Sequence, residues 1–278
     1  MFPGARADRD GADYVVLGAP LDVSTSFQPG TRFGPDRVRT FSRTFDDFDH
    51  LTAAHFTDLG VHDAGDLRAW DDAAEYLDFL EGSLSDVCAD GAVPLLLGGE
   101  HTVSIAGVRA CDPATVVVLD AHLDLRREYD GNPLSHSTVV RHALEVADRA
   151  AIVGARTGSE AEWERAGADD VTVVPPEAAG EWEPAVEGPV YLSVDVDAAD
   201  PAYAPGTGTM EPFGLTPREM HRIVRALAPD CVGFDIVEVN DRDDGQAATL
   251  AGKLLRAFVF AHASAAGRAG TGDHGTDA

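Results

Sequence analysis

The segment 115–124 reads TVVVLDAHLD, an apolar β-branched run that ends in regularly spaced polar residues. Such a run predicts a buried strand, because β-branched residues suit the pleated surface of a sheet. Seven further short apolar runs occur along the chain, at residues 14–17, 56–59, 93–97, 151–153, 171–174, 190–194 and 232–237. The sequence therefore predicts about eight strands.

Helical patterns lie between many of these runs. The clearest covers residues 70–89, where apolar residues recur at helical spacing. Others are expected at residues 35–41, 102–110, 138–147, 159–166, 217–227 and 249–266. Strands that alternate with helices predict an α/β protein with a parallel sheet covered on both faces. Periodicity alone fits an open three-layer sandwich and a closed eight-stranded barrel equally well.

The 278 residues contain no internal repeat, linker or change of composition. One domain is therefore expected over 1–278, with an ordered core from about residue 8 to 264. The segment 265–278 is rich in Gly, Ala and Asp and is expected to be a mobile tail. The apolar runs are all far shorter than the roughly 18 residues that a membrane-spanning helix needs.

The charge balance is strongly acidic. Against 48 Asp and Glu residues stand 21 Lys and Arg, for a net charge of −27, and Lys253 is the single lysine. This field repels phosphates, so it argues against a nucleic-acid or anionic-membrane partner. An acidic surface with so little lysine favours adaptation to high salt. The alternative is that the field attracts a cationic substrate.

Cysteine usage bears on the cellular compartment. Cys88, Cys111 and Cys231 are odd in number and widely spaced, which predicts buried free thiols in a reducing compartment. The first 20 residues lack a secretory pattern. A cytoplasmic protein is therefore expected.

Polar residues follow four of the predicted strands, and function in parallel sheets collects at the carboxyl ends of strands. The strand at 93–97 leads to His101, and the one at 115–119 leads directly to Asp120. The strand at 190–194 runs into Asp195 and Asp197, and the one at 232–237 ends before Glu238. Histidine and carboxylate side chains at strand ends predict a metal site.

Spacing sharpens this hypothesis. Asp120, His122 and Asp124 alternate along the chain, as do Asp195 and Asp197, and alternate residues of an extended chain point the same way. Four aspartates packed together would raise one another's pKa values, and a pair of divalent cations would cancel their charge. With His101 as a sixth ligand, this oxygen-rich set suits Mn²⁺ better than structural zinc.

Other polar residues have simpler interpretations. A single histidine or aspartate at a strand end is most often a solvated or capping residue, and only the repeated spacing argues otherwise here. Glu100 is expected to cap the following helix, and Asp63, Asp66 and Asp200 are expected to form turns. The remaining histidines lack spaced partners and are expected to be structural or surface residues: His50, His55, His62, His142, His221, His262 and His274.

Three of these segments resemble the signatures of the ureohydrolase superfamily, which includes arginases, agmatinases and formimidoylglutamases. They are GGEH (98–101), DAHLD (120–124) and SVDVDAADPAYAPGTG (193–208). Supporting matches run from SFQPGTRFGPDRVR (26–39) to EVN (238–240), so the resemblance covers nearly the whole chain. It implies an open α/β/α sandwich around a parallel, about eight-stranded sheet, and a homo-oligomer, either a trimer or a hexamer.

The resemblance also implies two Mn²⁺ per subunit and a role for each matching residue. One ion would be held by His101, Asp120, Asp124 and Asp195, and the other by His122 and Asp197, with Asp120 and Asp195 bridging. His136 matches the catalytic histidine, which would act as a proton shuttle. Glu238 matches the carboxylate that binds the guanidinium, and Asp124 would also hold the attacking water. The chain departs from the family pattern at Ser137 and Asp241, where Gly and Pro are usual.

The loop 125–133, LRREYDGNP, is similar to that of archaeal-type agmatinases and lacks the longer polar loop of arginases. This similarity predicts hydrolysis of agmatine to putrescine and urea, a step of polyamine biosynthesis, with Arg126, Asn132, His136 and Glu238 contacting the substrate. Arg126 would also suit a carboxylate, so formimidoylglutamase, arginase or another guanidino-compound hydrolase is the alternative. A non-catalytic family member would have lost a ligand, and all six ligand positions are filled.

Overall fold

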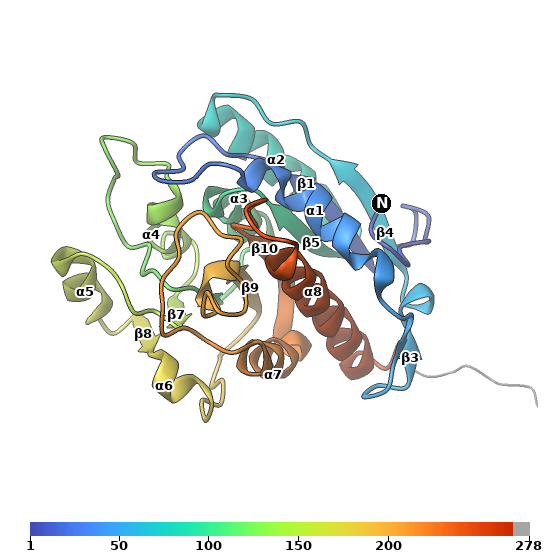
Figure 1. Cartoon of the computed structure of the whole chain (residues 1–278). Coiled ribbons are helices and arrows are strands. Elements are labelled where there is room, and N and C mark those ends of the chain that lie inside the picture. The colour runs from blue at the N-terminus through green and yellow to red at the C-terminus, as the bar shows by residue number, and fades with distance from the viewer. Residues whose placement is uncertain (269–278) are drawn as a thin grey trace, which may run out of the picture.

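The computed structural model describes residues 1–268. Eight strands form one sheet in the order β4 (Val61–Asp66), β1 (Tyr14–Ala19), β5 (Val93–Gly98), β10 (Cys231–Val237), β9 (Val190–Asp195), β6 (Thr115–Leu119), β7 (Arg149–Val153) and β8 (Val171–Val174). All neighbouring strands of this sheet are parallel. Because β4 and β8 are edges, the sheet is open (Figure 1).

Helices cover both faces of the sheet, which confirms the three-layer sandwich. One face packs against α1 (Gly34–Phe41), α7 (Pro217–Leu227) and α8 (Gln246–Ala265), with the short α6 (Pro176–Ala179) beside them. The other face packs against α2 (Ala73–Ala89), α3 (Ser104–Cys111), α4 (Val139–Ala143) and α5 (Glu160–Ala166). In Figure 1, α7 and α8 lie in front of the central strands.

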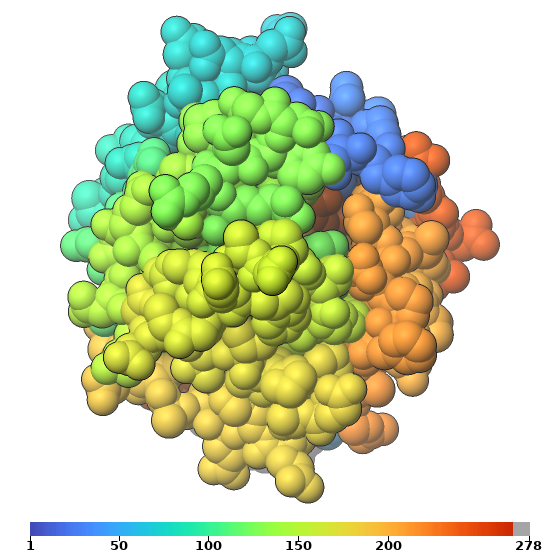
Figure 2. All heavy atoms as spheres, turned by 90° about the vertical axis from the view of Figure 1, so that its left-hand side faces the viewer, coloured from blue at the N-terminus to red at the C-terminus, as the bar shows by residue number. Residues whose placement is uncertain are grey.

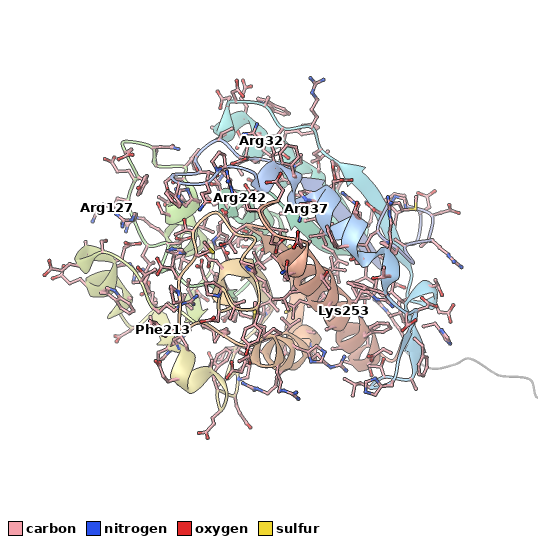
Figure 3. All side chains as sticks on the ribbon, in the orientation of Figure 1. Arg32, Arg37, Arg127, Phe213, Arg242 and Lys253 are labelled. Carbon is pink, nitrogen blue, oxygen red and sulfur yellow. The ribbon has the colours of Figure 1, made fainter. Side chains whose placement is uncertain are left out.

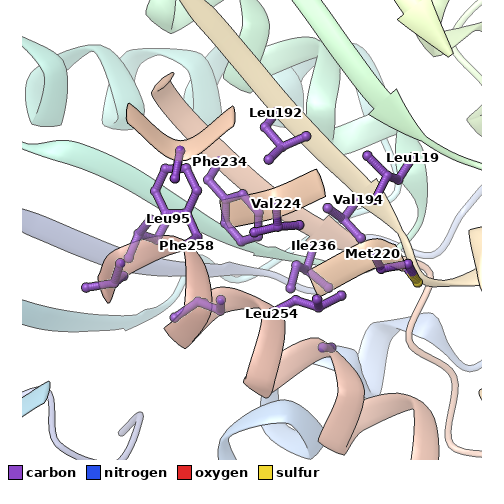
Figure 4. Packing of buried hydrophobic residues seen from close by; sticks show 14 of the residues in the cluster. Leu95, Leu119, Leu192, Val194, Met220, Val224, Phe234, Ile236, Leu254 and Phe258 are labelled. Atoms are coloured by element: carbon purple, nitrogen blue, oxygen red, sulfur yellow. The ribbon is translucent and has the colours of Figure 1, made fainter. Parts of the chain in front are cut away.

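The central strands β9 and β10 divide their side chains between the two faces. Leu192 and Ile236 belong to the cluster on the α7–α8 face, where Phe234 stacks on Phe258 with ring centroids 4.5 Å apart (Figure 4). Tyr191, one residue along from Leu192, belongs to the cluster on the opposite face. This alternation places every second residue of β9 and β10 under α3.

Helix α7 begins where the sequence predicts. Thr216 is its cap: the Thr216 hydroxyl accepts from the Glu219 amide, and the Glu219 carboxylate accepts from the Thr216 amide at 2.7 Å. Pro217 occupies the first turn, where its missing N–H costs nothing. The other predicted helices shift by a few residues, and α2 begins at Ala73 because Asp72 caps it.

The prediction of a strand at 56–59 is wrong. Phe56–Asp58 forms a 3-10 helix, and the strand of the main sheet in this part of the chain is β4, which begins at Val61. Phe56 is apolar because it is fully buried against Phe260, with ring centroids 5.7 Å apart. Beside it, β2 (Phe48–Asp49) and β3 (Ala54–His55) form a two-stranded hairpin.

Asp63 and Asp66 lie within β4, and the expected turn is reduced to a local irregularity of this strand, where Asp63 Oδ1 accepts from the Gly65 amide at 3.0 Å. Asp63 forms a bidentate pair with Arg39, at 2.9 and 2.8 Å, and Asp66 pairs with the same guanidinium. Arg39 is 6% exposed, so α1 is joined to the edge strand by a buried cation. Asp200, by contrast, does shape a turn, because its carboxylate accepts from the amides of Ala202 and Phe213.

The two ends of the described chain differ. Phe2 and Ala5 are already buried, ahead of residue 8 where the ordered core is expected to begin. Helix α8 continues to Ala265, and residues 269–278 of the expected tail, with His274, lie outside the described residues. No helix within 1–268 is long and apolar enough to cross a membrane.

The three cysteines differ in burial, and the labelled residues Lys253 and Arg127 lie on different parts of the chain. Cys231 is buried as expected, but Cys88 and Cys111 are only partly buried and their sulfur atoms lie 3.7 Å apart. Lys253 lies on α8, whereas Arg127 lies on the loop after β6, at the other side of the view (Figure 3).

Candidate metal centre and active site

The strand order brings the predicted ligands together. Strands β5, β10, β9 and β6 are neighbours in the sheet, although they are widely separated in sequence. Their carboxyl ends carry His101, Glu238, Asp195 and Asp120 respectively. Hydrophobic periodicity could not predict this order, so the convergence of the four ends is a finding of the structure.

The first group of side chains surrounds the His101 ring. Its Nδ1 atom lies 2.9 Å from Asp124 Oδ2, 3.2 Å from Asp120 Oδ2 and 3.6 Å from Asp195 Oδ2. All four residues are buried. One nitrogen and three carboxylate oxygens therefore face a common point.

The second group shares Asp120 with the first. His122 Nδ1 lies 3.0 Å from Asp197 Oδ2 and 3.4 Å from Asp120 Oδ1. The Asp195 carboxylate accepts from the Asp197 amide at 2.8 Å, which holds the two aspartates in a fixed relation. The six predicted ligands thus form two adjacent groups, and each group could hold one metal ion.

The backbone that places these residues is not extended throughout. Strand β6 ends at Leu119, and the positive φ of 49° at Asp124 turns its side chain back toward His101. Glu238 has a φ of 62°. Residues other than glycine rarely adopt this left-handed backbone conformation, and those that do are often found at functional sites. Alternation along an extended chain therefore does not account for the position of Asp124, which a turn brings to the group.

The electrostatics of the group favour a bound cation. Burial, followed by the neighbouring Asp120, raises the pKa of Asp124 to about 7. Burial and Asp197 raise the pKa of Asp195 well above its ordinary value. Within residues 1–268, His101 Nδ1 and Asp120 Oδ2 are buried atoms without a hydrogen-bond partner. Unpaired buried polar atoms are costly, and a shared cation would satisfy both.

The histidines are consistent with this interpretation. Although burial opposes it, Asp197 and Asp120 raise the pKa of His122 to about 12, so these carboxylates strongly favour a proton or another positive charge at this position. Metal binding requires neutral imidazole and releases such protons. Nitrogen and carboxylate donors in this ratio fit Mn²⁺ and similar divalent ions.

A cavity of 170 Å³ opens above the two groups. In Figure 2 the surface is hollowed where the blue N-terminal segment, the green segment and the orange segment meet. Five of the six predicted ligands line the cavity, namely His101, His122, Asp124, Asp195 and Asp197. The other lining residues are Ser26, Arg126, Tyr129, His136, Ser137, Thr209 and Glu238. The predicted guanidinium carboxylate and the predicted proton shuttle therefore face the same space as the ligands.

Glu238 is held by the metal-site backbone. Its Oε1 atom accepts from the His101 amide at 2.8 Å, and the side chain is buried. Burial is the main reason that the pKa of Glu238 rises to about 8. A carboxylate in this condition gains greatly from a cationic partner, because such a partner removes the cost of its buried charge.

His136 is held by a serine and a buried carboxylate. Its Nδ1 atom lies 3.3 Å from Ser24 Oγ, which in turn donates to Glu100 Oε1 at 2.8 Å. Glu100 also accepts from the Val23 and Ser24 amides at 2.7 Å. Glu100 therefore anchors the segment at 23–24 and does not cap a helix through its side chain, contrary to the expectation. Burial lowers the pKa of His136.

The predicted substrate loop is only partly at the cavity. Arg126 lines it, with Nε 3.2 Å from Glu162 Oε2 and its guanidinium carbon 5.5 Å from the Tyr129 ring centre. Asn132 does not line it, since its side chain bonds to the Leu134 amide and carbonyl. Sequence reasoning missed Ser24 and Tyr129, for which no spacing signal exists.

Comparisons with known proteins agree with this geometry. A model of the Arginase family matches residues 12–261. The chain belongs to the arginase family. It is 34% identical to the agmatinase of Bacillus subtilis (strain 168), over 94% of this chain and 95% of that protein. It is also 34% identical to the guanidinobutyrase of Pseudomonas aeruginosa, over 90% of this chain and 86% of that protein.

The arginase-family fold extends over nearly the whole chain. The crystal structure of the agmatine ureohydrolase of Thermoplasma volcanium superposes with a TM-score of 0.90 at 33% identity, covering 95% of this chain and 94% of that chain. The predicted family and the predicted open, parallel sandwich are thereby confirmed. As an arginase-family ureohydrolase, the chain has the histidine and aspartate groups of a binuclear metal site.

Proposed function

We propose that this ureohydrolase cleaves agmatine with water to give putrescine and urea, using two Mn²⁺ ions. The observation that carries the proposal is the charge of the cavity. Five carboxylates converge there: Asp120, Asp124, Asp195, Asp197 and Glu238. Two divalent cations would leave one negative charge, which a guanidinium cancels.

The chain's residues divide the work. His101, Asp120, Asp124 and Asp195 would hold one ion, and His122 and Asp197 the other, with Asp120 and Asp195 shared. When bound, such a pair of ions lowers the pKa of a water molecule toward neutrality and so supplies a nucleophile. Asp124 faces both His101 and the cavity, so its second function is to orient that water.

Glu238 binds the substrate. A guanidinium presents two N–H groups in one plane, which suits a carboxylate and makes a charge-assisted contact. Since Glu238 Oε1 already accepts from the His101 amide, the carboxylate is fixed relative to the first ligand group. The guanidinium carbon is thereby held over the ligands, and this orientation lowers the barrier.

His136 supplies the proton that the departing nitrogen needs. The Glu100 carboxylate can only accept, so the Ser24 hydroxyl donates to it and receives the hydrogen bond from His136 Nδ1. This arrangement keeps the proton on Nδ1, directed at Ser24, and leaves the lone pair of Nε2 toward Ser26 at the cavity rim. Nε2 takes a proton from the attacking water and passes it to the amine as the carbon–nitrogen bond breaks, and the product carbon keeps the oxygen of that water.

The tail of the substrate is selected beyond Glu238. Arg126 is the basic side chain of the loop at the cavity, and Glu162 offsets its charge through the 3.2 Å contact. Glu128 and Asp130 on the same loop are exposed and acidic. This balance favours the distal ammonium of agmatine over a carboxylate.

A urea-release assay tests the proposal. Agmatine, arginine, 4-guanidinobutyrate and formimidoylglutamate are compared at one salt and Mn²⁺ concentration, with product formation in place of urea for the last. We expect kcat/KM for agmatine to exceed that for each carboxylate substrate by about 100-fold, the value of a well-made charged contact. Preference for a carboxylate substrate would reject agmatine.

Hydrolysis of a carboxylate-bearing guanidino compound is the second candidate, because Arg126 lines the cavity. The variant Arg126→Ala separates the two. It should leave KM for agmatine unchanged or lower, whereas it would raise KM for a substrate whose carboxylate contacts Arg126. The matched control is Arg165→Ala, which removes an arginine paired with Asp170 away from the cavity.

A further inference from the structure

A buried polar chain lies behind His101, on the α3 side of the sheet. His101 Nε2 lies 3.1 Å from Ser193 Oγ. Ser193 Oγ donates to Asp235 Oδ1 at 2.6 Å, and Tyr191 donates to Asp235 Oδ2 at 2.8 Å. Each of these four residues is at most 1% exposed. Ser193 and Asp235 face one another in register across β9 and β10, with Tyr191 two residues earlier on the same face.

No ion pair in the described part of the chain explains why position 235 carries a carboxylate. Within residues 1–268 it forms no ion pair, and burial raises its pKa. A carboxylate in a sheet interior is costly unless its hydrogen bonds are satisfied. Those bonds come from two hydroxyls, and the chain leads through Ser193 to His101. The hydrogen-bonded chain from Asp235 therefore ends at the candidate metal centre.

The direction of each hydrogen bond follows from the donors. Tyr191 and Ser193 each donate to one oxygen of Asp235, so the single hydroxyl hydrogen of Ser193 is used and Ser193 Oγ can only accept from His101. His101 must then carry its proton on Nε2. Its Nδ1 atom is left with a lone pair that faces Asp120 and Asp124, which is the tautomer that binds a metal ion.

The surrounding backbone makes room for this chain. A Cβ atom at Gly107, inside α3, would stand 1.9 Å from the Tyr191 hydroxyl, and one at Gly233 would stand 2.7 Å from the same ring. Glycine is unfavourable inside a helix. Its presence at position 107 lets the Tyr191 hydroxyl reach Asp235.

We infer that Ser193 and Asp235 are positioning residues, which hold His101 in the metal-binding tautomer and strengthen its bond to the ion, with Tyr191 completing the chain. The inference rests on the proposed function in one respect, namely that a divalent cation occupies the first ligand group. Partners of this kind behind a ligating histidine typically contribute 10–100-fold to metal affinity.

Calorimetric titration of the chelator-treated, full-length protein with MnCl₂ tests the inference without any turnover. We expect Ser193→Ala and Asp235→Asn each to weaken one of the two Mn²⁺ equivalents by about 10–100-fold. Ser193→Thr, which keeps the hydroxyl, should restore the affinity. Excess Mn²⁺ should return most of the lost kcat, because these residues act through the ion's ligand.

The matched control is Ser42→Ala, which removes another fully buried serine hydroxyl from a place remote from His101. It should bind both ions as the wild type does. Wild-type affinity in Ser193→Ala, even with a lowered melting temperature, would overturn the inference. If Asp235→Asn does not fold, Ser193→Ala decides alone, since it deletes one oxygen atom. A wild type that binds fewer than two Mn²⁺ would instead refute the metal centre itself, and this result appears before any variant is measured.

Discussion

Two clusters of aspartates in the same sheet, one around the buried Asp63 at its edge and one at its centre, are compensated in opposite ways. At the edge, Asp63 and Asp66 of β4 enclose the guanidinium of Arg39, which bonds to both carboxylates. At the centre, the aspartates at the ends of β6 and β9 contact two histidines and, within residues 1–268, form no ion pair with an arginine or a lysine. The residue types are alike, and only the partner differs.

The difference shows in the acidity of the carboxyl groups. Although burial opposes it, Arg39 lowers the pKa of Asp63. In the central cluster burial and neighbouring carboxylates raise the pKa of Asp124 and Asp195, and only Asp120, between the two histidines, has a pKa that is lowered against the effect of burial. A carboxylate cluster that is neutralised by an arginine of the same chain stabilises the fold, whereas a cluster without such a partner favours binding of an external cation.

The largest expected effect is on kcat/KM, which should fall when the central cluster is changed and stay the same when the edge cluster is changed. Asp120 belongs to both ligand groups, so Asp120→Asn should lower kcat/KM by on the order of 10³, since metal ions supply several kcal/mol of transition-state stabilisation. Asp63→Asn makes the same chemical change away from the cavity and should leave kcat/KM of the folded protein unaltered. Steady-state urea release with Mn²⁺ measures both. Equal losses in the two variants would remove the distinction.

Stability should show the reverse order. Asp63→Asn leaves the buried Arg39 without its bidentate partner, and breaking a buried ion pair costs about 3–5 kcal/mol. In the metal-free protein, Asp120→Asn loses the attraction to His101 and His122 but also relieves the repulsion from Asp124 and Asp195, so its loss of stability should be smaller than that of Asp63→Asn. Urea-induced unfolding of both variants measures the difference.

The pH dependence of the edge pair has a definite sign. Because the pKa of Asp63 is lower in the folded chain, its contribution is present above the ordinary aspartate pKa, about 4, and is lost as pH falls toward the folded value. The wild type and Asp63→Asn should therefore converge in stability as the pH approaches that range. A constant gap from pH 7 to acid would show that Asp63 acts through packing alone.

The comparison also explains how far sequence reasoning can reach. His101, Asp120, Asp124, Asp195 and Asp197 were predicted because strand ends and regular spacing are local features. Arg39 was not connected to Asp63, because the contact joins a helix to a strand 24 residues away and leaves no periodic trace. For the same reason a full turn was predicted at 63–66, where the structure has a local irregularity within β4.

The remaining errors have similar physical causes. The run at 56–59 looks like a strand because Phe56 is apolar, but its burial comes from Phe260 on α8, far along the chain. Glu100 looks like a helix cap by position, whereas its partners Val23 and Ser24 come from another loop. The sheet order that joins the four strand ends is likewise a property of long-range packing.

Manganese should stabilise the central cluster and leave the edge pair unaffected. An ion that binds only the folded chain adds about 2.7 kcal/mol per site at 100 times its Kd. Thermal unfolding with and without Mn²⁺ should show this increase in the wild type and in Asp63→Asn. Asp120→Asn should lose most of it. An equal rise in all three proteins would indicate nonspecific binding to the acidic surface.

Glu100 represents a third kind of buried acid, which is satisfied by amides and hydroxyls. Its link to His136 runs through Ser24, so Ser24→Ala removes the hydrogen bonds of this hydroxyl to Glu100 and to the ring and amide of His136, each worth about 0.5–1.5 kcal/mol. We expect kcat to fall by up to about 10-fold with KM and bound Mn²⁺ unchanged. Thr25→Ala, on the same loop but bonded to Asp22, is the control. A changed metal content in Ser24→Ala would contradict the assigned role.

Salt should produce the smallest and most general effect, because it acts on exposed charges and spares both buried clusters. With a net charge of −27, self-repulsion extends over the Debye length of ~8 Å at 0.15 M salt, and shrinks with it to ~3 Å at 1 M. We expect molar KCl to raise the melting temperature by about 2–4 °C for each kcal/mol of repulsion that is screened. The increase should be the same in the wild type, Asp63→Asn and Asp120→Asn, since the changed residues are buried. An unchanged melting temperature between 0.1 and roughly 2 M KCl would refute salt adaptation as the reason for the acidic composition.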